Sequence, residues 1–199
     1  MIDKHNYWKN QTLVNRVDSD TAIAGEYYLL AKFVITNYPD RMETIQMPLL
    51  HIISHCIELS VKAIIIYAID AGYVDLQKTK VIHSHDIAYL TGLVLQIIET
   101  LCNDSNFPSE DLEYFSTTFP ALLNSFSDTL QVKTASYRYS YDIDRAGTVV
   151  SKGVPFGEDK DSPNICDISP IFYECYDALT YTHYILENIF PKPTPSDYL

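Results

Sequence analysis

The stretch HIISHCIELSVK, residues 51–62, decides the fold of this chain. Four polar side chains interrupt an otherwise apolar segment: His51, His55, Glu58 and Lys62. At about 100° per residue, these positions fall within a band about 60° wide on one face of a helix. Because apolar residues fill the remaining faces, the segment predicts a helix that lies at the centre of a helical bundle.

Helical periodicity continues along most of the chain. Capping residues, glycines and prolines divide the pattern into five predicted helical segments: 19–38, 47–71, 85–102, 109–126 and 169–190. The first two are long and connected by a short loop, which favours an antiparallel pair. We therefore expect a mainly α fold, an antiparallel helical bundle that forms a single domain over residues 1–190, followed by a proline-rich tail at 191–199.

The character of the sequence changes between the last two predicted helices. From about residue 131 to about residue 168, polar and aromatic side chains first alternate, and a glycine-containing stretch follows. This pattern predicts an irregular β-hairpin-like insertion before the last helix. Within it, Tyr137 and Tyr139 would lie on one side of a strand and Arg138 on the other. These three residues are candidate binding residues, because tyrosines beside an arginine suit a protein interface or the stacking of bases.

Composition limits the function. The chain has 199 residues, 47% of them hydrophobic, and a net charge of -12, so it can bury one substantial core but offers little attraction to a phosphate backbone. RNA is therefore a disfavoured partner. The four cysteines lack CxxC spacing and the N-terminal residues lack an apolar signal region, which indicates a cytoplasmic protein with free thiols. We expect no cofactor and no membrane association, since the polar positions interrupt the longest apolar stretch.

Two interpretations of the four polar side chains involve only the helix that contains residues 51–62. In the first, Glu58 and Lys62 form an i,i+4 ion pair on a water-facing side, and the histidines bond to backbone groups or loops. In the second, His51, His55 and Glu58 bind a metal ion, because an HxxxH spacing presents two imidazoles on the same side of a helix. An HxxxH pair without a glutamate between the histidines is a weak metal signature.

A third interpretation, which we prefer, involves the loop that precedes the third predicted helix. This loop contains the segment HSHD, residues 83–86. In this interpretation, Glu58 and Lys62 form a structural network with it, and His85 or Asp86 caps the third helix while bonding back to the second. Glu58, Lys62, His85 and Asp86 are accordingly candidate binding residues.

The same residues carry a family resemblance. The run LLHIISHCIELSVKAIIIYAIDAG followed by HSHDIAYL resembles the pattern of HEPN-domain proteins, in which a helix with a Glu-Leu and a Lys precedes a His-Asp-hydrophobic segment. The matching positions are Glu58, Leu59, Lys62, His85, Asp86 and Leu90. The segment SYRYS around Arg138 is similar to the arginine-tyrosine segment before the last helix of many members. The resemblance implies a helical bundle, homodimers and, in some branches, metal-independent RNA cleavage or roles in toxin–antitoxin and antiphage defence.

The chain departs from the catalytic members of this family. Those members resemble one another in an arginine followed four to six residues later by a histidine, whereas Arg138 is followed by YSYDIDRAG. The sequence therefore predicts a HEPN-like binding or regulatory module in an RNA-linked or defence setting, without its own catalysis and with a homodimer or another protein as partner. The alternatives are a divergent metal-independent ribonuclease that uses Arg138 as its catalytic residue, or a metal-dependent hydrolase built on His51, His55 and Glu58.

Overall fold

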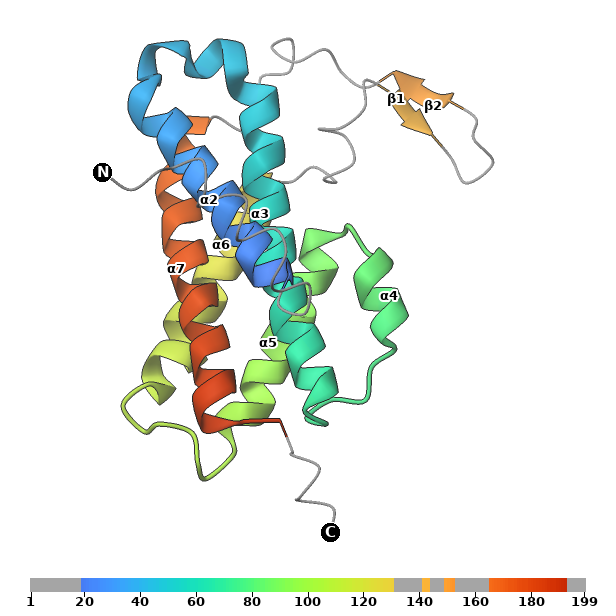
Figure 1. Ribbon diagram of the computed structural model, residues 1–199, viewed down its shortest axis with the longest axis vertical. Coiled ribbons are helices and arrows are strands. Elements are labelled where there is room, and N and C mark those ends of the chain that lie inside the picture. The colour runs from blue at the N-terminus through green and yellow to red at the C-terminus, as the bar shows by residue number, and fades with distance from the viewer. Residues whose placement is uncertain (1–18, 131–140, 144–148, 153–164, 193–199) are drawn as a thin grey trace, which may run out of the picture.

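The computed structural model describes residues 19–130, 141–143, 149–152 and 165–192. Within these residues the protein is mainly helical, as predicted, with the long helices packed lengthwise around a shared core (Figure 1). The helices follow the order α2, α3, α4, α5, α6 and α7 along the chain. Helix α3, which contains residues 51–62, lies between α2, α5 and α7.

Helices α2 and α3 form the predicted antiparallel pair. Helix α2 covers Ser19–Asn37, a short 3-10 turn follows at Pro39–Arg41, and α3 covers Met42–Asp70. Helix α3 thus begins before the predicted start at Met47, and Pro48 lies inside it. Pro48 is past the first turn, so it lacks the N–H that would donate to the carbonyl four residues earlier and its ring crowds that carbonyl, which weakens the helix at this point without ending it.

The end of α3 is fixed by a glycine, as predicted. Gly72 has a φ of 80°, a conformation that side chains with a Cβ rarely adopt. Its N–H donates to the carbonyl of Ile69 at 3.0 Å, and the N–H of Tyr73 donates to the carbonyl of Ala68 at 2.9 Å. These two bonds satisfy the last carbonyls of the helix in a Schellman motif, so the chain reverses direction here.

Helices α4 and α5 follow this reversal. Helix α4, Lys78–His83, occupies a segment that we had predicted as a loop, and α5 covers Ile87–Cys102. Asp86 is the N-cap of α5, because its side chain accepts a hydrogen bond of 3.1 Å from the N–H of Tyr89. The predicted start of the third helix is therefore confirmed, and its cap lies next to His85 in sequence.

The predicted segment 109–126 contains a change of helix type. A π-helical turn at Tyr114–Thr118 leads directly into α6, which covers Phe119–Leu130. Because the π-helical turn continues into α6 without a break, Pro120 lies inside one helical run, and the change of hydrogen-bond pattern falls where the proline removes an N–H. Helix α7, Ile165–Ile189, begins before the predicted start at Ser169, so the predicted insertion ends earlier and Pro170 lies inside the helix.

Helix α3 lies at the centre of the core. Ile53, Ile57 and Ile64 are fully buried, and each stabilises the fold by about 1.5–3 kcal/mol relative to an exposed position. By length and composition alone, the segment Pro48–Asp70 could cross a membrane, but most of it is covered by the other helices, as in the core helix of a compact domain. Its two mid-helix charged residues, Glu58 and Lys62, are both buried.

Two short strands lie between α6 and α7. Strand β1, Tyr141–Ile143, pairs antiparallel with β2, Val149–Lys152, with a register shift next to Ile143. Most of the predicted insertion lies outside the described residues. The irregular β-hairpin-like insertion therefore stays a prediction.

Candidate functional site

The polar residues of α3 converge on the carboxylate of Glu58. Only 1% of the Glu58 side chain is exposed. Its Oε1 accepts a hydrogen bond of 2.8 Å from Lys62 Nζ, one turn later on α3, and lies 2.9 Å from His85 Nδ1. His55 Nδ1 lies 3.8 Å from the other oxygen, Oε2, on the preceding turn. Three nitrogen-bearing side chains thus surround one buried carboxylate, an arrangement that we call the Glu58 cluster (Glu58, His55, Lys62 and His85).

The loop between α4 and α5 completes the Glu58 cluster. Besides Glu58, Lys62 Nζ also donates to the backbone carbonyl of Ile82 at 2.9 Å. Ile82 belongs to α4, whereas His85 lies in the loop that follows and has half of its side chain exposed. Asp86, the next residue, caps α5. The two contacts predicted for one residue, His85 or Asp86, are therefore present but divided: His85 bonds back to Glu58 and Asp86 caps α5. The water-facing position expected for the Glu58–Lys62 pair is wrong, because both side chains are buried.

The histidines of α3 pack against aromatic rings. The rings of His51 and His55 are stacked with centroids 5.9 Å apart, and Tyr27 of α2 meets His55 edge-on at 4.9 Å. Among the described residues, no three His, Cys, Asp or Glu side chains come together in a way that could hold a metal ion. In addition, the ammonium of Lys62 already contacts the carboxylate that His51 and His55 would share with a metal. This geometry lends the metal interpretation no support.

The charge of Glu58 is stabilised despite its burial. Burial raises the pKa of the carboxyl, but the neighbouring His55, Lys62 and His85 lower it by more, so the pKa falls to about 2 from an ordinary value of 4.5. Glu58 is therefore ionised at neutral pH. A general base needs a pKa near the operating pH, so this carboxylate is poorly suited to proton transfer in catalysis.

The four cysteines are free thiols, as predicted. Cys56 and Cys175 are buried, and burial raises the pKa of each to about 12. The Cys56 thiol donates to the carbonyl of Ala24 at 3.2 Å, which ties α3 to α2. A thiol with such a pKa is almost entirely protonated at neutral pH, so neither residue is suited to nucleophilic catalysis.

The remaining candidates from the sequence lie in the predicted insertion. Tyr137, Arg138 and Tyr139 are outside the described residues. Their binding role, and the catalytic role of Arg138 in the ribonuclease alternative, stay predictions. Among the described residues, the structure brings together Glu58, Lys62 and His85 as binding candidates, with Asp86 beside them in the chain.

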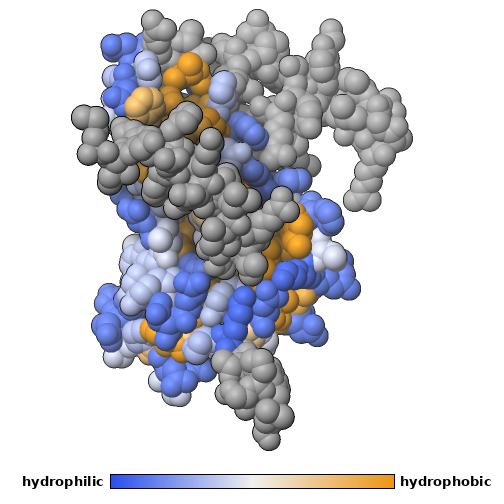
Figure 2. Space-filling model, in the orientation of Figure 1, coloured by the Kyte–Doolittle hydropathy of each residue, from blue (hydrophilic) through white to orange (hydrophobic). Residues whose placement is uncertain are grey.

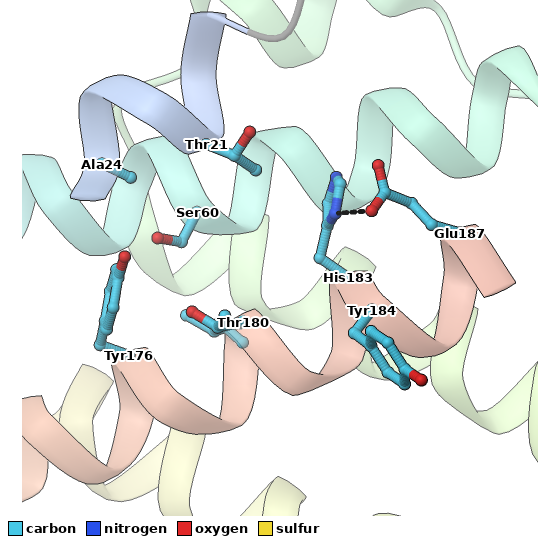
Figure 3. A pocket seen from close by; sticks show the side chains of 9 residues that line it. Thr21, Ala24, Ser60, Tyr176, Thr180, His183, Tyr184 and Glu187 are labelled. Carbon is cyan, nitrogen blue, oxygen red and sulfur yellow. Dashed lines mark ion pairs between the residues drawn. The ribbon is translucent and has the colours of Figure 1, made fainter.

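A cavity that the sequence did not predict lies on another side of α3. Its volume is about 320 Å³, and residues of α2, α3 and α7 line it (Figure 3). From α7, Tyr176 and Thr180 stand at one end, and His183 and Glu187 at the other, with His183 Nδ1 3.4 Å from Glu187 Oε2. Tyr176 and His183 share a helical stripe with Leu179, a spacing that is typical of core residues. Both are instead only partly buried.

Comparison with known proteins adds no relative. No protein-family model, no curated protein and no solved structure matches this chain. The HEPN resemblance of Glu58, Lys62, His85 and Asp86 therefore stays a prediction from the sequence, beside the geometry described above.

Proposed function

We propose that this protein is a HEPN-like binding or regulatory module of the cytoplasm, acting in an RNA-linked or defence setting without catalysis of its own. The observation that carries the proposal is the Glu58 cluster. Its carboxylate is buried, ionised and bonded to Lys62 and His85, so these polar residues join α3 to the α4–α5 loop. Because the carboxylate is buried and already contacts Lys62 and His85, a metal or a substrate could reach it only by displacing these neighbours, which favours a structural role over the hydrolase alternative.

The exposed face of α2 supports the binding part of the proposal. Ile23, Leu29, Leu30 and Phe33 are all exposed and fall within an arc of about 120° around the helix. In Figure 2, apolar side chains gather on the upper part of the molecule, where α2 ends. Exposed apolar patches of this kind are typical of interaction surfaces.

A second copy of the chain suits this face. Each copy has a net charge of -12, so two copies repel one another over most of their surfaces. An apolar strip avoids this repulsion, and the burial of Leu29 and Phe33 against their symmetry mates would drive association. We therefore propose a homodimer that packs through α2.

The absence of catalysis is tested with labelled single-stranded RNA. Purified protein in excess is incubated with the RNA, with and without EDTA, beside the variants Arg138→Ala and His51→Ala, and its metal content is measured. The proposal expects no cleavage in any sample and no stoichiometric metal. EDTA-resistant cleavage that is lost in Arg138→Ala would establish the ribonuclease alternative, and metal that is lost in His51→Ala would establish the hydrolase.

A further inference from the structure

The cavity between α2, α3 and α7 has the chemistry of a ligand site. One wall is closed by aromatic packing, because Tyr28 of α2 stacks on Tyr176 of α7 with ring centroids 4.0 Å apart. Beyond this stack, α2 and α7 leave the cavity between them, and Ser60 of α3 forms part of its floor (Figure 3). Its volume of about 320 Å³ is at the lower end of the range for small-molecule pockets.

Hydroxyl groups and one carboxylate supply the polar lining. Ser60 is buried and donates its proton to the carbonyl of Cys56 at 2.9 Å, so its oxygen keeps lone pairs for accepting hydrogen bonds. Thr180 and Tyr176 add further hydroxyls from α7. Glu187 is the one acidic residue among the nine described residues that line the cavity, and its Oε2 lies 3.4 Å from Nδ1 of His183, another lining residue; none of the nine is Lys or Arg. This lining suits a ligand that donates hydrogen bonds, and it disfavours an anion.

The same end of α7 already binds an ammonium group from within the chain. Lys192 places its Nζ 4.7 Å from the centre of the Tyr67 ring and 3.5 Å from Asp70 Oδ2. Tyr67 in turn meets the ring of His183 edge-on at 5.7 Å. An aromatic face and a carboxylate therefore hold one cation beside the cavity, and Glu187 offers another carboxylate at the end of the cavity where His183 lies.

We propose that the cavity binds a small primary amine with an apolar body. The ammonium lies against the carboxylate of Glu187 at one end of the cavity, and the apolar body extends along α7 toward Leu179 and the ring of Tyr176 at the other end. The net charge of -12 concentrates cations near the surface and favours their entry. This site is independent of the proposed homodimer and of the Glu58 cluster.

Three probes of one shape and different charge test the proposal: 2-phenylethylamine, 2-phenylethanol and phenylacetate. Each is titrated into ¹⁵N-labelled full-length protein, and the shifts of backbone amide signals give both the affinity and the place of binding. The amine is expected to shift the amides of the cavity lining and to bind about tenfold more tightly than the alcohol, while phenylacetate leaves these signals unchanged.

Two charge-neutralising variants complete the experiment. Glu187→Gln is expected to weaken amine binding about tenfold. Glu174→Gln, at an exposed position of α7 outside the cavity lining, serves as the matched control and keeps wild-type affinity. The proposal is overturned if none of the probes binds, if phenylacetate binds as tightly as the amine, if Glu187→Gln retains full affinity, or if the shifts map away from the cavity.

Discussion

Lys62 Nζ lies 2.8 Å from Glu58 Oε1 inside the bundle, where at most 8% of either side chain is exposed. Lys78 Nζ and Asp70 Oδ1 are also 2.8 Å apart, but on the surface, with exposed fractions of 44% and 35%. Water screens the second pair and not the first. At the same N···O distance, the loss of one partner therefore costs more stability in the buried pair, because it leaves an uncompensated charge in a medium of low polarity.

Glu58 links the stability of the fold to pH. Its pKa is about 2 in the folded protein, below the ordinary 4.5, so the unfolded chain takes up this proton more readily. The contribution of Glu58 is therefore complete above about pH 4.5 and is lost as the pH falls toward about 2, and it amounts to on the order of 3 kcal/mol. Urea unfolding at several pH values measures this slope.

The variant Glu58→Gln isolates this contribution. Without the titrating carboxyl, the unfolding free energy should change less steeply with pH over the acidic range. Glu174→Gln, which removes an exposed carboxyl from α7, is the control and should keep the wild-type slope. A Glu58→Gln protein with an unchanged slope would show that Glu58 is not the coupled group.

Asp86 should stabilise α5 as its N-cap. Asp86→Ala removes the acceptor for the N–H of Tyr89 and is expected to cost about 1 kcal/mol of unfolding free energy, measured by urea unfolding followed by circular dichroism. Asp86→Asn keeps a capping oxygen and should lose much less. Equal losses in the two variants would argue against the cap and for a role of the charge itself.

The cysteines should differ in reactivity. Burial raises the pKa of Cys56 and Cys175 to about 12, whereas Cys166 is exposed at the start of α7. Brief treatment of the native protein with iodoacetamide, followed by mass spectrometry of its peptides, should therefore find Cys166 modified first and the two buried thiols modified only after denaturation. Early modification of Cys56 would mean that α2 opens away from α3 in solution.

The proposed dimer through α2 predicts the effect of charges on its exposed face. Leu29→Lys and Phe33→Lys each place an ammonium where apolar packing is expected, so sedimentation velocity should show a shift from dimer to monomer. Leu112→Lys changes a leucine that is also exposed but lies outside α2, and it should remain dimeric. A monomeric wild-type protein, or a dimer that both α2 variants retain, would contradict this interface.

Local signals predicted much of the fold. The end of α2 before Pro39, the end of α3 at Gly72 and the start of α5 at Asp86 depend on a proline, a glycine and a capping carboxylate, each of which acts on its own turn of backbone. Helix α4 was not predicted because KTKVIH is short and mostly polar, and it forms where Val81 is buried against the core. Intrinsic propensity does not reveal that kind of tertiary stabilisation.

The sequence predicted which residues form the candidate site, but not that they are buried. The spacing of Glu58 and Lys62 indicated an ion pair, but such pairs usually lie on the surface. The pair is buried only because Ile82 of α4 and His85 of the following loop pack over α3. The cavity beside His183 was not predicted for a related reason. The helical spacing of His183 is that of a core residue, and the cavity exists only because α2 and α7 separate at this point.

The unfolding free energies of Lys62→Met and Lys78→Met test most directly whether the Glu58 cluster supports the fold. Each variant removes an ammonium 2.8 Å from a carboxylate and keeps an unbranched apolar side chain. We predict a loss of about 3–5 kcal/mol for Lys62→Met and of at most about 1 kcal/mol for Lys78→Met in urea unfolding at neutral pH. A Lys62→Met protein that is as stable as the wild type, or more stable, would contradict the structural role and would point to a site maintained for function.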